Sequence, residues 1–204
     1  VAVGGLALGL GAAAVPTAGA AEGEQARATL RLADGKSAGR VVFYGDDATV
    51  TRVEVVVALP RFTTTVPRAE VAGFHGFHVH ANSDPANGEG CLADPAQLRS
   101  TWFVSADGHL AEAGTTHGDH TGDLPPLLLT QRGRAHSVTL TERFALEDVV
   151  GKAVVLHAGR DNLGNVPVGD GPTQYTPNSA EATSLTARTG NAGDRLACGV
   201  VTAR

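Results

Sequence analysis

The chain is poor in methionine, aromatic residues and cysteine, and it is rich in glycine. Its 204 residues contain no methionine, 6 phenylalanines, 2 tyrosines, 1 tryptophan and 2 cysteines, against 26 glycines. Scarce aromatic residues beside so much glycine favour a compact chain with many turns over a helical bundle. With 42% hydrophobic residues, a chain of this length can fill one core.

An excess of basic residues is also missing. The formal net charge is −5, with 16 Lys and Arg against 21 Asp and Glu. The charge balance therefore gives no general attraction to nucleic acid or to acidic membranes, and we expect no nucleic-acid partner. The glycine clusters lack the strand–GxxxxGK–helix context of a phosphate-binding loop, which makes them typical of turns.

Charged residues are absent before Glu22. The run is apolar at first and then small, and Ala18-Gly19-Ala20 fits a small-x-small cleavage site. We predict a signal peptide over residues 1–20, a single domain over 21–204, and a secreted or extracytoplasmic protein of the periplasm or cell-wall space. A membrane span is the alternative, but the run is rich in Gly and Ala and is broken by Pro16. No stable membrane insertion of the mature chain is expected.

The two cysteines, Cys91 and Cys198, lie 107 positions apart. An even pair in an exported chain predicts a disulfide bond. Two buried free thiols are the alternative.

Short strand patterns recur between turn residues, and they favour a β-sandwich or β-barrel. No helical pattern extends over ten residues, although 146–151 can form one turn. Two long stretches, 81–124 and 158–194, interrupt the strand pattern, and loops of this length in a compact domain are typical of function. The predicted strands cover 28–33, 51–59, 73–80, 136–144, 152–158 and 196–201.

Three of the eight histidines lie in the segment "GFHGFHVH", residues 73–80. Side chains alternate between the two faces of a strand, so His78 and His80 share one face, with Cα atoms roughly 6.6 Å apart. Two imidazoles at that spacing can converge on one metal ion. His75 falls on the opposite, apolar face, where a structural role is expected.

The remaining histidines supply further metal ligands. His109, His117, His120 and Asp123 lie within 15 residues of one loop and can close a four-coordinate site of the structural zinc type. His78, His80 and His157 form a second group on strands. Imidazole with a single carboxylate suits zinc and copper rather than calcium or magnesium. One loop histidine, with its two ring nitrogens, can serve both sites.

The motifs "GFHGFHVH", "SADGH", "HGDHTGD", "VVLHAGRDNLGN" and "GNAGDRLACGV" occur in this order. With them the chain resembles the copper/zinc superoxide dismutases, of the bacterial exported type, over roughly residues 26–201. The resemblance implies an all-β, eight-stranded Greek-key barrel or sandwich with two long functional loops, a metal-binding loop and an electrostatic loop. Only two residues separate His117 from His120, whereas many members of the family carry a longer segment there.

The resemblance also implies roles for individual residues. It implies a carboxylate, Asp161, that accepts from His78 and His117 and so links a copper ligand to a zinc ligand, and a guanidinium beside copper, Arg195, that attracts the anion. The alternatives are a turn residue for Asp161 and a pairing with Asp194 for Arg195. The implied copper ligands are His78, His80, His109 and His157, and the implied zinc ligands are the bridging His109 with His117, His120 and Asp123.

The implied activity is the dismutation of superoxide to dioxygen and hydrogen peroxide by a redox-cycling copper, with a structural zinc held on the other side of His109. His109 and Arg195 would take part in catalysis, and a homodimer stays a possible assembly. One alternative is an exported copper-binding or copper-buffering protein without turnover. The other is a structural β-sandwich with a vestigial site, although every position of the ligand set is filled.

Overall fold

The computed structural model describes residues 25–45, 49–60, 71–165 and 179–204. The predicted signal peptide lies outside these residues. The described part is built mainly of strands: β1 (Gln25–Leu32), β2 (Ser37–Gly45), β3 (Thr51–Ala58), β4 (Gly73–His75), β5 (Phe77–His80), β6 (Leu127–Leu129), β7 (Arg134–Thr141), β8 (Ala153–His157), β9 (Arg195–Val200) and β10 (Thr202–Ala203).

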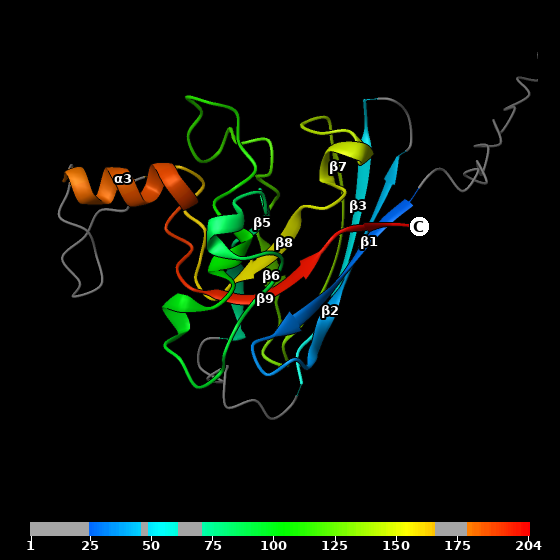
Figure 1. The fold of residues 1–204 in the computed structure, drawn as a ribbon, viewed down its shortest axis with the longest axis horizontal. Helices are drawn as coiled ribbons and strands as arrows, with labels where there is room; N and C mark the ends of the chain where they lie inside the picture. The colour runs from blue at the N-terminus through cyan, green and yellow to red at the C-terminus, as the bar shows by residue number, and fades with distance from the viewer. Residues whose placement is uncertain (1–24, 46–48, 61–70, 166–178) are drawn as a thin grey trace, which may run out of the picture.

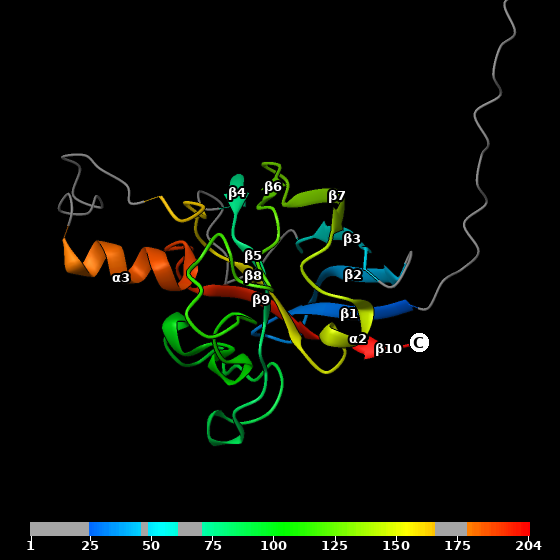
Figure 2. The same cartoon turned by 90° about the horizontal axis from the view of Figure 1, so that it is seen from above.

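Eight of these strands form one curled sheet. Its neighbours run in the order β5-β8-β9-β1-β2-β3-β7, with β10 added to β1, while β4 and β6 pair separately. All described pairings are antiparallel. Seen from above, the sheet bends so that β7 comes round toward β6 and β4 (Figure 2). The predicted all-β fold is confirmed.

The main core lies inside this curl and follows the strand alternation. In β1, every second residue from Ala26 to Leu32 is buried, and the residues between them are exposed. Phe43 of β2 is fully buried and meets Phe144 edge to face, with ring centroids 6.2 Å apart. The strands β1, β2 and β3 therefore bury one face, as expected for a sheet with solvent on its other side.

By contrast, β5 and β8 are buried on both faces. Their second face is covered by the loop between β5 and β6, which contributes Trp102 and Phe103 to a smaller apolar cluster that includes Cys198. The predicted disulfide is confirmed: Cys91 and Cys198 are bonded, with Cα atoms 5.6 Å apart. The bond ties this loop to β9.

Helices are few in the described chain. The 3-10 turns η1 (Pro85–Asn87), η2 (Arg99–Thr101) and η3 (Val104–Ala106) lie in the covering loop, and α2 (Leu146–Val149) forms the predicted single turn. The helix α3 (Ala180–Thr189) was not expected, because a pattern over ten residues is missing from the sequence. It extends to one side of the sheet (Figure 1). The helices in the described part of the chain are all too short or too polar to cross a bilayer.

The unexpected helix α3 has end signals in place of an apolar stripe. The Ser179 side chain accepts a hydrogen bond from the Ala182 backbone N–H, and Gly190 ends the helix in a left-handed conformation. Only Ala182 and Thr186 are buried, so the hydrophobic periodicity that predicts helices was absent.

Candidate metal centre

The pairing of β5 with β8 brings three histidines together. His78 lies opposite Val155 and His80 opposite Ala153, and His157 follows two residues after Val155, so the three histidines share one face of the strand pair. His78, His80 and His157 are all essentially buried. The alternation of the strands sends Phe77 and Val79 into the main core and the two histidines toward the covering loop.

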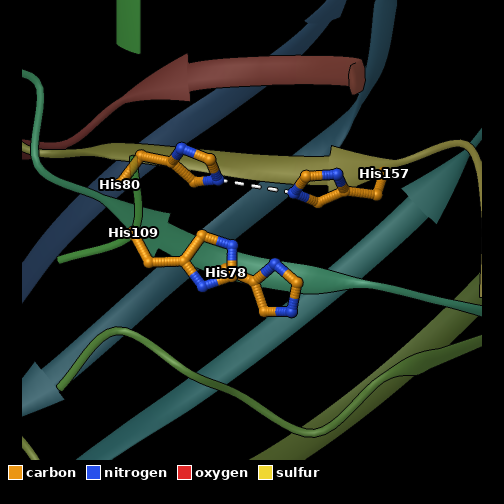
Figure 3. A group of neighbouring side chains, drawn as sticks. All are labelled: His78, His80, His109 and His157. Atoms are coloured by element: carbon orange, nitrogen blue, oxygen red, sulfur yellow. Dashed lines mark hydrogen bonds between the residues drawn. The ribbon is translucent and has the colours of Figure 1, made fainter. Parts of the chain in front are cut away.

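His109 joins this group from the covering loop, where it makes a bridge pairing with His80. The rings of His78, His80, His109 and His157 gather in one place (Figure 3). One ring nitrogen from each residue lies within 4.8 Å of those of the other three. The structure therefore brings together the four residues that the resemblance implied as copper ligands.

Hydrogen bonds fix the ring protons of two of these histidines. The Nδ1 atom of His80 lies 2.8 Å from the Asp107 carbonyl oxygen, and that of His157 lies 3.0 Å from the Gly193 carbonyl oxygen. A carbonyl oxygen only accepts, so each Nδ1 must carry the proton. The two Nε2 atoms, 3.4 Å apart, then face each other with lone pairs when the rings are neutral. A cation between them would relieve their repulsion.

A second group of donors surrounds one carboxylate oxygen. Asp123 Oδ1 lies 2.8 Å from Nδ1 of His109, 3.1 Å from Nδ1 of His117 and 3.5 Å from Nδ1 of His120. The Nδ1 atoms of His109 and His120 are 3.2 Å apart. Three nitrogens and one oxygen in this arrangement match the four-coordinate sites that hold zinc. His109 belongs to both groups, through its two ring nitrogens.

Asp161 lies between the two groups. Its Oδ2 atom is 2.6 Å from His78 Nε2, and its Oδ1 atom is 2.8 Å from His117 Nε2. The carboxylate therefore fixes both ring tautomers and leaves each Nδ1 atom for a metal, which is the usual role of an orienting carboxylate. Gly190 leaves room for this contact, since an added Cβ would lie 2.2 Å from Asp161 Oδ1 and 2.4 Å from His117 Nε2.

The donor atoms fit metal ions. Among the described residues, His78 Nδ1 and His109 Nε2 are buried ring nitrogens without a hydrogen-bond partner. Such atoms are costly to bury unless something binds them. His78 and His109 also belong to a second close cluster, with His117 and Asp123, which suits the imidazole preference of copper and zinc. His120 is not part of that cluster, and its Nδ1 atom is the farthest of the three from Asp123 Oδ1, at 3.5 Å.

The protonation of the metal-free site differs between the two groups. Burial lowers the pKa of His78 from its ordinary value and lowers the pKa of His80 and His157 well below it. Burial also lowers the pKa of His109 to about 4. Although burial opposes the charge, the contacts with Asp123 and Asp161 raise the pKa of His117 to about 9. The four histidines implied as copper ligands (His78, His80, His109 and His157) are therefore neutral at pH 7.5, whereas His117 is charged.

Arg195 begins β9 opposite His157. Its guanidinium donates to the backbone carbonyls of Phe103 and Asp107 and lines an open pocket of about 400 Å³. Both Asp194 and Arg195 are described, and no ion pair joins them. The covering loop therefore holds Arg195 in place at the pocket.

Asp107 was not singled out by the sequence. Its backbone has φ +64°, a conformation that favours glycine. Its carboxylate accepts hydrogen bonds from the backbone N–H groups of Ser83 (2.6 Å) and Asp84 (2.8 Å), while its carbonyl accepts from His80 and Arg195. These bonds compensate for the unusual conformation and connect a proposed copper ligand with the pocket arginine.

Comparison with known proteins agrees with this geometry. A relative named superoxide dismutase (Cu-Zn) from Mycolicibacterium paratuberculosis is 35% identical over 144 residues, which cover 68% of this chain and 60% of the relative. An extracellular superoxide dismutase (Cu-Zn) from Brugia pahangi is 34% identical over 138 residues, covering 63% of this chain and 56% of the relative. This chain thus spans less than two thirds of the length of these relatives.

A solved structure described as the clock protein EA4 is similar over 89% of this chain and 95% of that chain, with a TM-score of 0.59. At 23% identity, this similarity shows the fold alone. The family model described as copper/zinc superoxide dismutase (SODC) matches residues 37–201, which is more than half of the chain. The chain therefore belongs to the copper/zinc superoxide dismutase family.

Proposed function

We propose that this chain dismutes superoxide: two superoxide anions and two protons give one dioxygen and one hydrogen peroxide. The observation that carries the proposal is the position of His109, whose Nδ1 atom lies among the zinc-type donors and whose buried Nε2 atom has no hydrogen-bond partner among the described residues. A ring shared in this way couples a redox-active site to a fixed one.

In this proposal the group of four histidines shown in Figure 3 holds copper, and the donors around Asp123 Oδ1 hold zinc. A bound copper would supply the one-electron acceptor and donor that both halves of the reaction require. Zinc would be structural, since its four donors leave no position open for substrate. The proposed copper ligands are His78, His80, His109 and His157, and the proposed zinc ligands are His109, His117, His120 and Asp123.

The chain's own residues then have distinct tasks. His80 and His157 keep their protons on Nδ1, where backbone carbonyls hold them, so each presents Nε2 to copper. His109 can release a proton from Nε2 when this atom becomes a ligand and hold one when it does not. The guanidinium of Arg195 attracts the superoxide anion into the pocket, although the net charge is −5.

We also propose that residues 1–20 direct export and that 21–204 form one domain. The disulfide bond supports an oxidising, extracytoplasmic location. The relative from Brugia pahangi, which is named extracellular, points the same way.

A copper-binding protein without turnover is the second candidate, because the four-histidine group would bind copper in either case. Arg195 distinguishes the two, since a buffer of copper has no use for a cation held at the pocket. The experiment compares superoxide decay catalysed by the copper- and zinc-loaded chain with decay catalysed by Arg195→Ala, across a range of ionic strength. Arg134→Ala, on the exposed end of β7, is the control.

We expect the loaded chain to accelerate decay strongly, and Arg195→Ala to lose much of this rate and most of its dependence on salt. Copper binding without accelerated decay would contradict the dismutase. If the decay rate depended on salt equally in the parent chain and in Arg195→Ala, the role of Arg195 would be contradicted, but the dismutase would not.

A further inference from the structure

The tight turn that carries the zinc-type ligands is held by an arginine that belongs to neither metal group. Arg143 follows β7, and its Nη1 atom donates to the His120 carbonyl oxygen at 2.9 Å. Its Nη2 atom donates to the Gly118 carbonyl oxygen at 2.7 Å. One planar guanidinium thus bridges two carbonyls of a turn in which only two residues separate His117 from His120.

Asp123 holds the same two peptide positions from the other side. Its Oδ2 atom accepts from the backbone N–H of Gly118 at 2.7 Å and from that of His120 at 3.1 Å. In both Gly118 and His120, the backbone N–H is therefore bonded to the Asp123 carboxylate and the backbone C=O to the Arg143 guanidinium. Because Oδ2 is occupied, Oδ1 is left to face the three histidine rings.

The backbone around Arg143 is tied to the sheet, although the Arg143 side chain is exposed. The neighbouring Phe144 is buried in the main core, and its carbonyl accepts from the Thr51 hydroxyl at 3.0 Å. The Arg143 backbone N–H donates to Thr141 Oγ1 at 3.2 Å. A side chain fixed to the sheet can therefore transmit the sheet's order to the turn.

We propose that Arg143 is a positioning residue of the zinc site. By bridging Gly118 and His120 it sets the turn before zinc binds, so that the Nδ1 atoms of His117 and His120 converge with Asp123 Oδ1. The inference rests on the zinc site of the proposed function. It says that Arg143, which lies outside this short turn, keeps the turn ordered.

Charge and positioning predict opposite effects for the loss of Arg143. A guanidinium close to a zinc site repels the dication, so its charge alone weakens zinc binding, and a neutral replacement would tighten it. Positioning predicts the reverse, because a turn that is not preset must be ordered at the expense of the binding free energy.

The test measures zinc affinity by competition with a chromophoric chelator, using the full, disulfide-oxidised, copper-free chain. Arg143→Met removes both the charge and the donors, while Arg143→Lys keeps the charge but cannot fork across two carbonyls. Arg134→Met, at the other end of β7, is the matched control. Copper affinity is measured for every variant in the same way.

We expect Arg143→Met and Arg143→Lys to weaken zinc binding by about ten- to a hundredfold, as loss of an outer-shell partner does, with copper affinity unchanged. Zinc binding as tight as in the parent chain, rescue by lysine, or an equal loss of copper affinity would each overturn the proposal. The proposed zinc site is tested separately with His120→Ala. If this variant binds zinc as tightly as the parent chain, the zinc site of the proposed function is contradicted.

Discussion

Metal binding should release a defined number of protons, and the number depends on the order in which the metals are added. The metal-free site differs between its two groups at pH 7.5. The contacts with Asp123 and Asp161, against the effect of burial, hold the pKa of His117 at about 9. Burial holds the pKa of His109 at about 4, so this ring is neutral and carries one proton.

Zinc added first must displace the proton on Nδ1 of His117. With a pKa of about 9, the ring is roughly 97% protonated at pH 7.5, so about one proton should leave. The number should fall as the pH rises through 9, because the ring is then already neutral. If zinc takes Nδ1 of His109, the one proton of that ring moves to Nε2.

Copper added after zinc should expel this last proton, because Nε2 of His109 would become a ligand too. His78, His80 and His157 contribute almost none, since burial keeps their pKa values low. Copper added to the zinc-free chain should release almost no proton, because His109 can keep its proton on Nδ1, 2.8 Å from Asp123. Subsequent zinc should then release about two.

Isothermal titration calorimetry in buffers of different ionisation enthalpy gives these numbers directly. When the observed enthalpy is plotted against the buffer's ionisation enthalpy, the slope is negative, and its magnitude is the number of protons that the protein releases to the buffer. Zinc binding without proton release at pH 7.5 would refute the assignment of His117. Copper binding to the zinc-loaded chain without proton release would refute the sharing of His109.

Three further predictions concern the surroundings of the site. Gly190→Ala should weaken zinc binding at least about tenfold in a chelator competition, because its Cβ would displace Asp161 from His117. The control is Gly151→Ala, which is also at positive φ but faces open space, and it should leave zinc binding unchanged. Equal effects of the two substitutions would contradict this prediction. Reduction of the Cys91–Cys198 bond, which spans 107 residues, should destabilise the metal-free chain by up to about 5 kcal/mol in urea unfolding, and an unchanged midpoint would contradict it. Phe43→Ala should cost about 3–5 kcal/mol in the same assay, because the fully buried ring would leave a cavity, and a loss below about 1 kcal/mol would place it outside the core.

The strands around the site could be predicted because their side chains alternate between the two faces of the sheet. The pattern of 73–80 placed His78 and His80 on one face, and the structure has them there, facing the covering loop. The single strand expected over this segment is divided at Gly76. An added Cβ at Gly76 would lie 2.5 Å from the Ala192 side chain, so the close approach of another loop requires glycine.

Edge strands and long-range contacts were harder to predict. In β7 the apolar residues Val138 and Leu140 are 56% and 63% exposed, so its apolar face is the outer one. Alternation identifies such a strand without telling which face is buried. The strand β2 was not among those predicted, although its Val41 and Phe43 are fully buried.

The ligand types were visible in the sequence, but their supports were not. Asp107 and Arg143 act through backbone carbonyls and amides, and a backbone contact leaves no mark on the residue that it reaches. An aspartate before a glycine and an arginine after a strand read as ordinary turn and surface residues. Only the fold shows that the Asp107 carbonyl accepts from His80 and Arg195, and that Arg143 donates to the turn between His117 and Asp123.

The most direct test of the proposed function is a count of turnovers. The copper- and zinc-loaded chain is mixed with a large excess of superoxide, and superoxide decay and hydrogen peroxide are followed together. We predict that each chain removes many equivalents of superoxide and that one hydrogen peroxide forms for every two consumed. Decay that, after the first equivalent per copper, is no faster than superoxide decay without the protein would contradict the dismutase and leave a protein that only binds the metal.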